Sequence, residues 1–214
     1  MQTTSCPIWG TSAQVRSTTH DEYDVDSQRA GGRYAIAYEA KVNLRGADER
    51  EKALLTTWIV DQHRAGEECP TITSDVLEAV RLRTPLRLSV KFERLFEFLS
   101  KRLRFVGEEI AIAPKWLIAG GESTIYLKGQ KPSDVESIRH KLCAWLECIK
   151  DDELTAIVKL QIELGLFKKD DTKIILTAKG YERLEEVERR LVPSVQAFVA
   201  MWFNDEMNDA YQHG

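Results

Sequence analysis

The chain has 214 residues, with 30 lysines and arginines against 34 aspartates and glutamates, and a formal net charge of −4. Hydrophobic residues make up 43% and charged residues 30%. This composition excludes global disorder, a collagen-like repeat and a strongly basic nucleic-acid binder. The longest apolar run, around residues 197–203, is far shorter than the roughly 20 residues of a membrane helix. We expect no membrane partner and, with only four scattered cysteines, a reducing cytoplasmic location.

The first residues carry little periodic signal. Residues 1–30 are rich in Ser, Thr and Asp and have few regularly spaced apolar positions. They predict a flexible or loosely docked arm. Gly31 and Gly32 then interrupt the chain, and the alternation over Arg33–Glu39 predicts a short strand.

Residues 31–104 are expected to form a mainly helical region. Apolar residues at helical spacing predict a helix over residues 48–64, and Gly66 is placed to end it. Thr73 or Ser74 can cap a short helix that follows. The clearest amphipathic pattern covers residues 86–103, where apolar residues recur at helical spacing from Leu88 to Leu103.

Residues 105–192 show the order of elements of a winged-helix-like domain. Short β-type runs over residues 105–127 precede two helical patterns, one from Pro132 to Ile149 and one over residues 151–164. A hairpin and a final helix are expected to follow. The fold class is therefore expected to be α+β and mostly helical, with an additional N-terminal helical region.

The hairpin carries a family resemblance. A strand begins at Gly165, residues 168–173 form a polar tip, and Thr177 is placed to cap a helix over residues 178–191. The stretch GLFKKDDTKIILTAKGYERLEEV resembles the wing and last helix of winged-helix proteins, and the similarity extends over roughly residues 133–192.

Residues 195–214 predict the start of a further domain. VQAFVAMWF, at residues 195–203, is typical of a strand that is buried on both faces, and residues 204–213 predict the start of a helix. A strand this apolar needs neighbours on both sides, as in a parallel sheet. We therefore expect an incomplete C-terminal α/β element.

The segment FVAMWFNDEMNDAYQHG, at residues 198–214, resembles the opening of prokaryotic nucleoside 2-deoxyribosyltransferase-like, TIR-related domains. The resemblance implies that Met201, Trp202 and Phe203 lie at the edge of a nucleotide pocket in a completed domain. It places the catalytic carboxylate of the family beyond Gly214. The chain would then be a non-catalytic accessory, sensor or assembly module of an antiviral defence or nucleotide-signalling protein, with a protein partner or self-association.

The N-terminal sequence CPIWG resembles the CPxCG zinc knuckle that precedes some of these domains, but Trp9 stands in place of the second cysteine. Structural zinc sites need four ligands, usually from paired spacings. Cys143 and Cys148 are five residues apart on one expected helix and should point in different directions. We expect no metal, no cofactor and no catalytic residue in this chain.

Positive charge is concentrated in residues 81–104, which carry eight basic residues against Glu93 and Glu97. The alternative function is therefore a winged-helix DNA- or RNA-binding regulator, although the helix expected over residues 151–164 is acidic and would repel phosphate. The candidate nucleic-acid or phosphate contacts are Arg81, Arg83, Arg87, Lys91, Arg94, Lys168, Lys169 and Lys173. In the other interpretation, the basic side chains of residues 81–104 cover the core with their stems and pair with the acidic segment 182–190.

Overall fold

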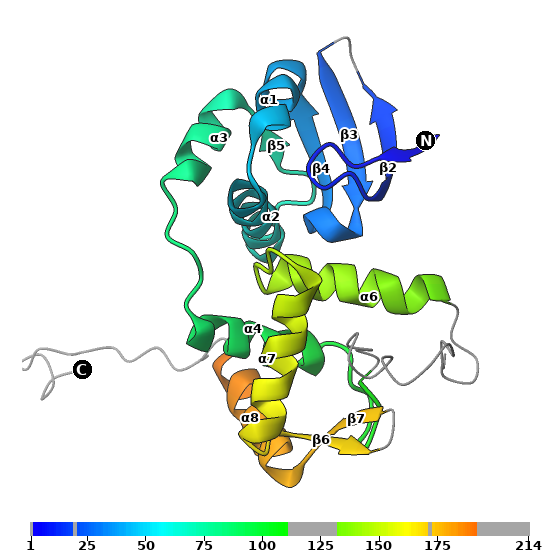
Figure 1. Cartoon of the computed structure of the whole chain (residues 1–214), viewed down its shortest axis with the longest axis vertical. Coiled ribbons are helices and arrows are strands. Elements are labelled where there is room, and N and C mark those ends of the chain that lie inside the picture. Colours follow the sequence, from blue (N-terminus) through cyan, green and yellow to red (C-terminus); the bar gives the residue numbers. More distant parts are fainter. Residues whose placement is uncertain (1, 19–20, 111–131, 171–172, 192–214) are drawn as a thin grey trace, which may run out of the picture.

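The computed structural model describes residues 2–18, 21–110, 132–170 and 173–191. These residues form two halves, each with its own hydrophobic core. The N-terminal half is a sheet with helices on one side, and the C-terminal half is a group of helices with a hairpin (Figure 1). Within the described part of the chain, no helix is both long and apolar enough to span a membrane.

The sheet of the N-terminal half is mixed. Its first four strands run antiparallel in chain order, and β5 pairs in parallel with β4 after a helical crossover. The strands are β1 (Gln2–Ser5), β2 (Ser12–Ser17), β3 (Glu22–Ser27), β4 (Gly32–Ala37) and β5 (Thr71–Ile72). The short strand expected over Arg33–Glu39 is thus confirmed as β4 up to Ala37, whereas Tyr38 and Glu39 begin a helix.

The prediction of a flexible arm over residues 1–30 is wrong, because this stretch supplies three of the five strands. The strands are short, β2 is largely exposed, and the buried residues of β3 include the polar Asp24 and Ser27, so few positions are apolar. Val25 is fully buried opposite Tyr34, while the side chain of Asp24 pairs with Arg33 at 2.7 Å. A sheet that buries so few residues per strand gives a weak periodic signal.

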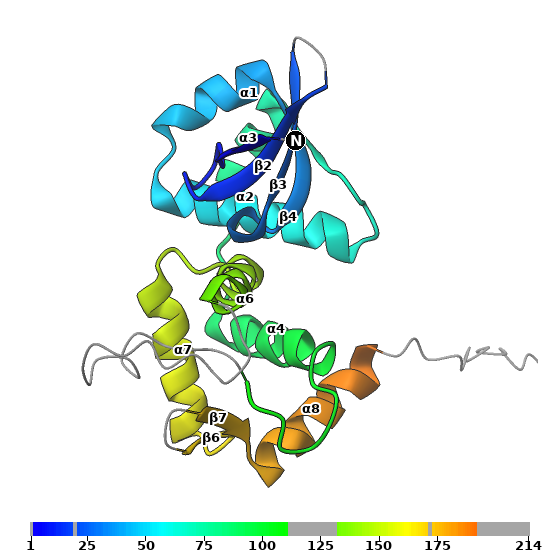
Figure 2. The ribbon, with the colours of Figure 1, turned by 90° about the vertical axis from the view of Figure 1, so that its right-hand side faces the viewer.

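Three helices lie together on one side of this sheet (Figure 2). They are α1 (Tyr38–Asn43), α2 (Glu49–Arg64) and α3 (Ser74–Arg81), with a 3-10 turn η2 (Leu44–Gly46) after α1. The expected helices over residues 48–64 and after Thr73 are confirmed. Asp48 and Glu51 form a capping box at the start of α2, with the Asp48 Oδ1 to Glu51 N distance at 2.8 Å.

The C-terminal half begins with α4 (Leu88–Ser100) and ends with α8, which packs against α4 (Figure 1). Its other elements are α6 (Pro132–Trp145), α7 (Asp151–Glu163), β6 (Phe167–Asp170), β7 (Lys173–Leu176) and α8 (Ala178–Leu191). Its largest fully buried side chains are Phe96, Phe167, Leu95, Leu142, Leu146 and Leu154. Thr177 caps α8 as predicted, since Gly180 N donates to Thr177 Oγ1 at 3.1 Å.

The hairpin has a third partner from far away in the sequence. Ile110 N donates to the Ile174 carbonyl at 2.9 Å and forms an antiparallel bridge to β7. β6 extends to Asp170 and β7 begins at Lys173, so the strands are longer than the predicted tip over residues 168–173 allows. The described residues are thus α+β. The remaining β-type runs over 111–127 and the element expected at 195–214 lie outside them.

Candidate functional site

The two halves meet along α6, which crosses between the sheet half and the rest of the helical half (Figure 1). α6 contacts α2, α4 and the 3-10 turn η1 (Gln28–Ala30). We call the region where these elements meet the junction. It contains a group of charged side chains, which we call the Asp61 cluster, and the turn at residues 146–150, which charged side chains hold in place.

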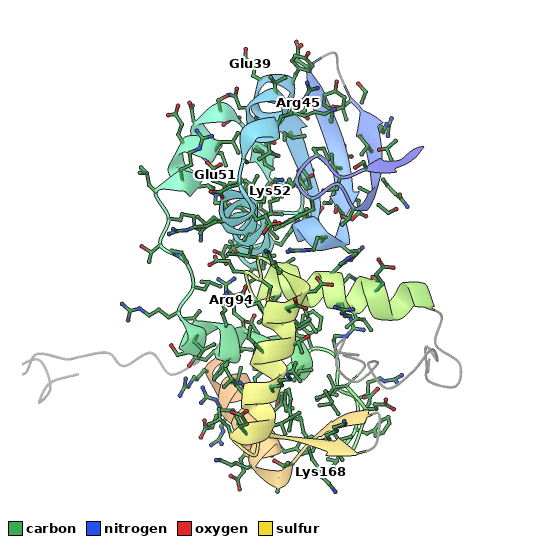
Figure 3. The ribbon with its side chains drawn as sticks, viewed as in Figure 1. Glu39, Arg45, Glu51, Lys52, Arg94 and Lys168 are labelled. Atoms are coloured by element: carbon green, nitrogen blue, oxygen red, sulfur yellow. The ribbon has the colours of Figure 1, made fainter. Side chains whose placement is uncertain are left out.

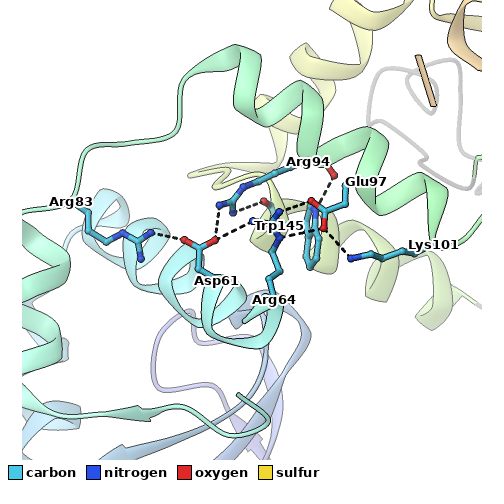
Figure 4. Close-up of polar contacts among 7 residues, drawn as sticks. All are labelled: Asp61, Arg64, Arg83, Arg94, Glu97, Lys101 and Trp145. Atoms are coloured by element: carbon cyan, nitrogen blue, oxygen red, sulfur yellow. Dashed lines mark hydrogen bonds and ion pairs between the residues drawn. The ribbon is translucent and has the colours of Figure 1, made fainter. Parts of the chain in front are cut away.

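The Asp61 cluster lies at the C-terminal end of α2 (Figure 4). The Asp61 carboxylate accepts a hydrogen bond from Arg94 at 2.6 Å and one from Arg83 at 2.5 Å, and Arg64 lies 3.7 Å away. The Arg94 side chain is only 8% exposed and also donates to the Trp145 carbonyl at 3.4 Å. One carboxylate therefore ties α2 to the segment after α3, and Arg94 carries the connection through α4 to α6.

Glu97 extends this cluster (Figure 4). Its carboxylate accepts hydrogen bonds from Arg64 at 2.6 Å and Lys101 at 3.0 Å. Burial alone would raise the pKa of Glu97, but the bonds from Lys101 and Arg64 outweigh it and hold that pKa below its ordinary value. Trp145 Nε1 donates to the Arg94 carbonyl at 2.8 Å, and the Arg64 guanidinium lies 5.6 Å from the centroid of the Trp145 ring.

The turn at residues 146–150 begins where α6 ends. Glu147 has a φ of 53°, the left-handed region, and its N–H points to Ala144 O at 3.4 Å. Cys148 N donates to Cys143 O at 2.8 Å. These two bonds form a Schellman motif, which closes the helix and turns the chain back on its last residues.

Four parts of the chain hold this turn. Arg29 Nη2 donates to the Cys148 carbonyl at 2.6 Å, and Lys91 Nζ donates to the Glu147 carbonyl at 3.0 Å. Leu86 N donates to Glu147 Oε1 at 2.7 Å, which secures the side chain of the strained residue. Glu153 Oε2 accepts from the backbone after Cys148 at 2.9 Å, and its other oxygen pairs with Lys91. Donors from both halves thus converge on five residues.

Arg29 is the contribution of the N-terminal half to this turn. It is 5% exposed, and its guanidinium lies 3.7 Å from the centroid of the Trp9 ring. Burial lowers the pKa of Arg29 from its ordinary value. A cation beyond the C-terminus of α6 is favourably placed to interact with the negative end of the helix dipole.

Most of the candidate phosphate contacts of residues 81–94 form ion pairs within the protein, although the Arg81 side chain is still 49% exposed. Arg81 pairs with Glu51 of α2 at 2.5 Å, and Arg83 and Arg94 pair with Asp61. Lys91 is 8% exposed and bonded within the turn. Arg87 differs, because its side chain is exposed at the start of α4.

The expected pairing of these side chains with segment 182–190 is wrong, since their partners are Glu51, Asp61 and Glu153. In the contacts between α4 and segment 182–190, the acidic residue lies on α4 and the basic residues lie in the segment. Glu93 accepts from Arg183 at 3.4 Å and from Arg190 at 3.1 Å.

The hairpin lysines lie apart from the junction. Figure 3 shows Lys168 at the far end of the helical half from Arg94. Lys168 and Lys169 are exposed on β6, and Lys173 is the first residue of β7. The structure thus separates the predicted basic residues into a group that forms ion pairs within the protein, the exposed Arg87 and a hairpin group. Met201, Trp202 and Phe203 lie outside the described residues.

The cysteines correct one expectation. Cys143 and Cys148 do not point in different directions on one helix, because α6 ends at Trp145 and the turn buries both side chains in the same core. Cys6 lies in the core of the N-terminal half, where its sulfur is 3.5 Å from the Tyr34 hydroxyl oxygen. Among the described residues, no group of three or more His, Cys, Asp and Glu side chains could hold a metal ion.

Sequence reasoning missed Arg29, Asp61, Trp145 and Glu147. Asp61 and Arg64 are spaced i, i+3, and Glu97 and Lys101 are spaced i, i+4, so two local pairs of the Asp61 cluster were visible. The contacts that tie the junction to distant segments join residues 22 to 119 positions apart, and no local pattern signals them. Comparisons with protein-family models, curated proteins and solved structures found no match for this chain.

Proposed function

We propose that this chain is a non-catalytic accessory module that acts in sensing or assembly. The observation that carries the proposal is the junction, where buried ion pairs and backbone bonds fix a sheet half against a helical half. Such an arrangement can pass a displacement at one half to the other, because the packed and bonded elements between them do not deform independently.

We further propose that the C-terminal half is winged-helix-like. Its order is α4, the Ile110 bridge, α6, α7, the β6–β7 hairpin and α8. A bridge between a residue after the first helix and the second hairpin strand supports this assignment. α7 begins with Asp151, Asp152 and Glu153, so the helix before the wing starts with negative charge. This favours a protein-binding use of the module over a phosphate-binding one.

The place of this module in a nucleoside 2-deoxyribosyltransferase-like defence or nucleotide-signalling protein is part of the proposal. Its support is the amino-acid sequence of residues 198–214, which lie outside the described structure. The proposal requires a protein partner or a second copy of the chain as the binding partner.

The first test is turnover. The full chain is incubated with nucleosides and, separately, with NAD, and release of the base or of nicotinamide is followed by chromatography. We expect no product above the protein-free blank. Turnover well above the blank would contradict a non-catalytic module.

The alternative, a DNA- or RNA-binding regulator, is favoured by one observation, the exposed Lys168 and Lys169 on the hairpin. Fluorescence anisotropy with labelled duplex DNA separates the two proposals. An accessory module should bind weakly or not at all at physiological salt, whereas a regulator should bind tightly and lose affinity steeply as salt rises. The informative variant is Arg87→Glu with Lys168→Glu, since Lys91 is buried and its replacement would disturb the fold.

A further inference from the structure

The Schellman motif at the end of α6 places two thiols together. In this motif the residue two positions beyond the cap packs against the third residue before it. Here those positions are Cys148 and Cys143, joined by the 2.8 Å backbone bond. Both side chains are fully buried in the same hydrophobic core cluster. The contact is thus set by the backbone geometry of the helix end.

The two thiols lie in the hydrophobic core of the helical half and also have polar neighbours. Cys143 Sγ donates to Asp151 Oδ1 at 3.7 Å, and Asp151 is itself paired with Arg139 at 2.8 Å. The Arg29 guanidinium approaches from the other half, bonded to the Cys148 carbonyl. The Cys143 thiol therefore has a proton acceptor beside it, and a cation is bonded to the backbone of Cys148.

We propose that Cys143 and Cys148 are a redox-sensitive dithiol that a peroxide oxidises to a disulfide, which ties the redox state to the turn that joins the two halves. The dithiol itself follows from the geometry of the turn. Only the regulatory consequence of oxidation rests on the proposed function, because the disulfide would act on the junction, and the proposed function depends on that junction.

The chemistry balances with hydrogen peroxide as the oxidant. Cys143 passes its proton to Asp151, and the sulfur attacks one peroxide oxygen, which breaks the O–O bond and gives a sulfenic acid and, with the proton, water. The Cys148 sulfur then attacks the sulfenic sulfur, the S–S bond forms, and the leaving hydroxide takes the Cys148 proton as a second water. Two thiols lose two electrons and two protons, and one peroxide becomes two waters.

Oxidation has a mechanical consequence at the turn. A disulfide would bring the two sulfurs to a bond length of about 2.05 Å, so Cys148 must shift or rotate. Its carbonyl is the acceptor of Arg29 at 2.6 Å, and the preceding carbonyl is the acceptor of Lys91. The new bond therefore acts directly on contacts from η1 and α4.

Burial controls the rate of this reaction. Neither sulfur is exposed, so peroxide reaches them only when the junction opens locally. The oxidation rate should rise when the Asp61 cluster is weakened, because this cluster holds the same halves together from another point. Asp61→Asn should accelerate disulfide formation by about tenfold or more, in proportion to the increased population of the open state.

The experiment uses the full chain under native conditions. After treatment with hydrogen peroxide, free thiols are alkylated in denaturant and the intact mass is measured. We expect a product in which two fewer thiols are alkylated and the chain itself is about 2 Da lighter. Peptide mapping should link Cys143 to Cys148. Cys143→Ser and Cys148→Ser should each abolish this product, whereas Cys6→Ser and Cys69→Ser should retain it.

The mapping of the unaltered chain needs no variant, so a variant that fails to fold does not spoil the test. Alkylation of all four thiols after peroxide would overturn the proposal, and so would a disulfide that maps to Cys6 or Cys69. Turnover or tight DNA binding by the reduced chain would contradict the proposed function and leave the disulfide result unaffected. The two proposals therefore fail in different measurements.

Discussion

The segment of residues 81–94 and the hairpin strand β6 are both basic in sequence, but their basic side chains have different environments in the structure. Arg83 and Arg94 point into the junction and share Asp61, whereas Lys168 and Lys169 lie exposed on the hairpin. Positive charge in a sequence is therefore not the same as positive charge on a surface. The side chains that looked most suited to phosphate hold the protein together instead.

The two regions should also differ in what their charges contribute to stability. A guanidinium that is 8% exposed, like that of Arg94, has lost most of its water and depends on its partners. An exposed lysine keeps its hydration and contributes little. Substitutions matched across the two regions measure this difference directly.

The largest effect is expected at Asp61. Asp61→Asn keeps the shape of the side chain but leaves Arg83 and the buried Arg94 without their carboxylate. We expect a loss of about 3 kcal/mol in the free energy of unfolding, measured by urea titration. The matched change in the hairpin, Lys168→Met, should stay within about 0.5 kcal/mol.

A double variant sharpens this prediction. Arg94→Met removes the charge that Asp61→Asn leaves unpaired, so the two substitutions together should cost less than the sum of the single effects. Strict additivity would show that Arg94 does not depend on Asp61, and the contrast between the two regions would then be lost.

The next effect concerns how the hairpin is held. A Cβ added at Gly180 would lie 2.2 Å from the Leu166 carbonyl oxygen and 2.9 Å from Leu176 Cδ2. Gly180→Ala should therefore force α8 away from the base of the hairpin and cost about 1–3 kcal/mol in thermal or urea unfolding. Gly46→Ala is the control, because no atom lies within 4 Å of its added Cβ and its effect should be close to zero. Equal effects of both substitutions would contradict close packing of α8 on the hairpin.

A smaller effect depends on pH. The pKa of Glu97 is lower in the folded protein than its ordinary value, so its ionised form stabilises the fold above the unfolded pKa of about 4.3. This contribution is lost as pH falls through the folded pKa. Glu97→Gln should thus cost about 1–2 kcal/mol at pH 7, and the difference from the unaltered chain should vanish at acidic pH. A difference that is constant from pH 7 to pH 3 would show that Glu97 does not act through its charge.

Helix positions were largely predictable from sequence because their signals are local. Thr73 and Thr177 cap α3 and α8 where capping residues were expected, and helical spacing of apolar residues marked α2, α4 and α7. By contrast, the sheet over residues 2–27 was missed, since its strands are short and have few buried apolar residues. Helix caps and helical periodicity depend on neighbouring residues, whereas the partner of a half-exposed strand cannot be identified from its neighbours in the sequence.

The end of α6 shows why the candidate site was missed. A glycine in the left-handed position usually marks the end of a helix, but here that position is Glu147, whose side chain is held by Leu86 N at 2.7 Å. Without the glycine, the helix was expected to continue to Ile149, and the two thiols were placed on different faces. The residue that ends the helix is stabilised from 61 positions away, which local pattern cannot reveal.

The smallest effect is expected from the exposed basic residues themselves. Arg87→Glu combined with Lys168→Glu changes two exposed side chains and should alter the free energy of unfolding by no more than about 0.5 kcal/mol. Because the fold is retained, any change in affinity for duplex DNA in an anisotropy titration reports on the surface alone. An accessory module should show the same weak binding before and after the substitutions. A large loss of affinity, with a shallower salt dependence, would instead identify the hairpin and the start of α4 as a phosphate-contacting surface.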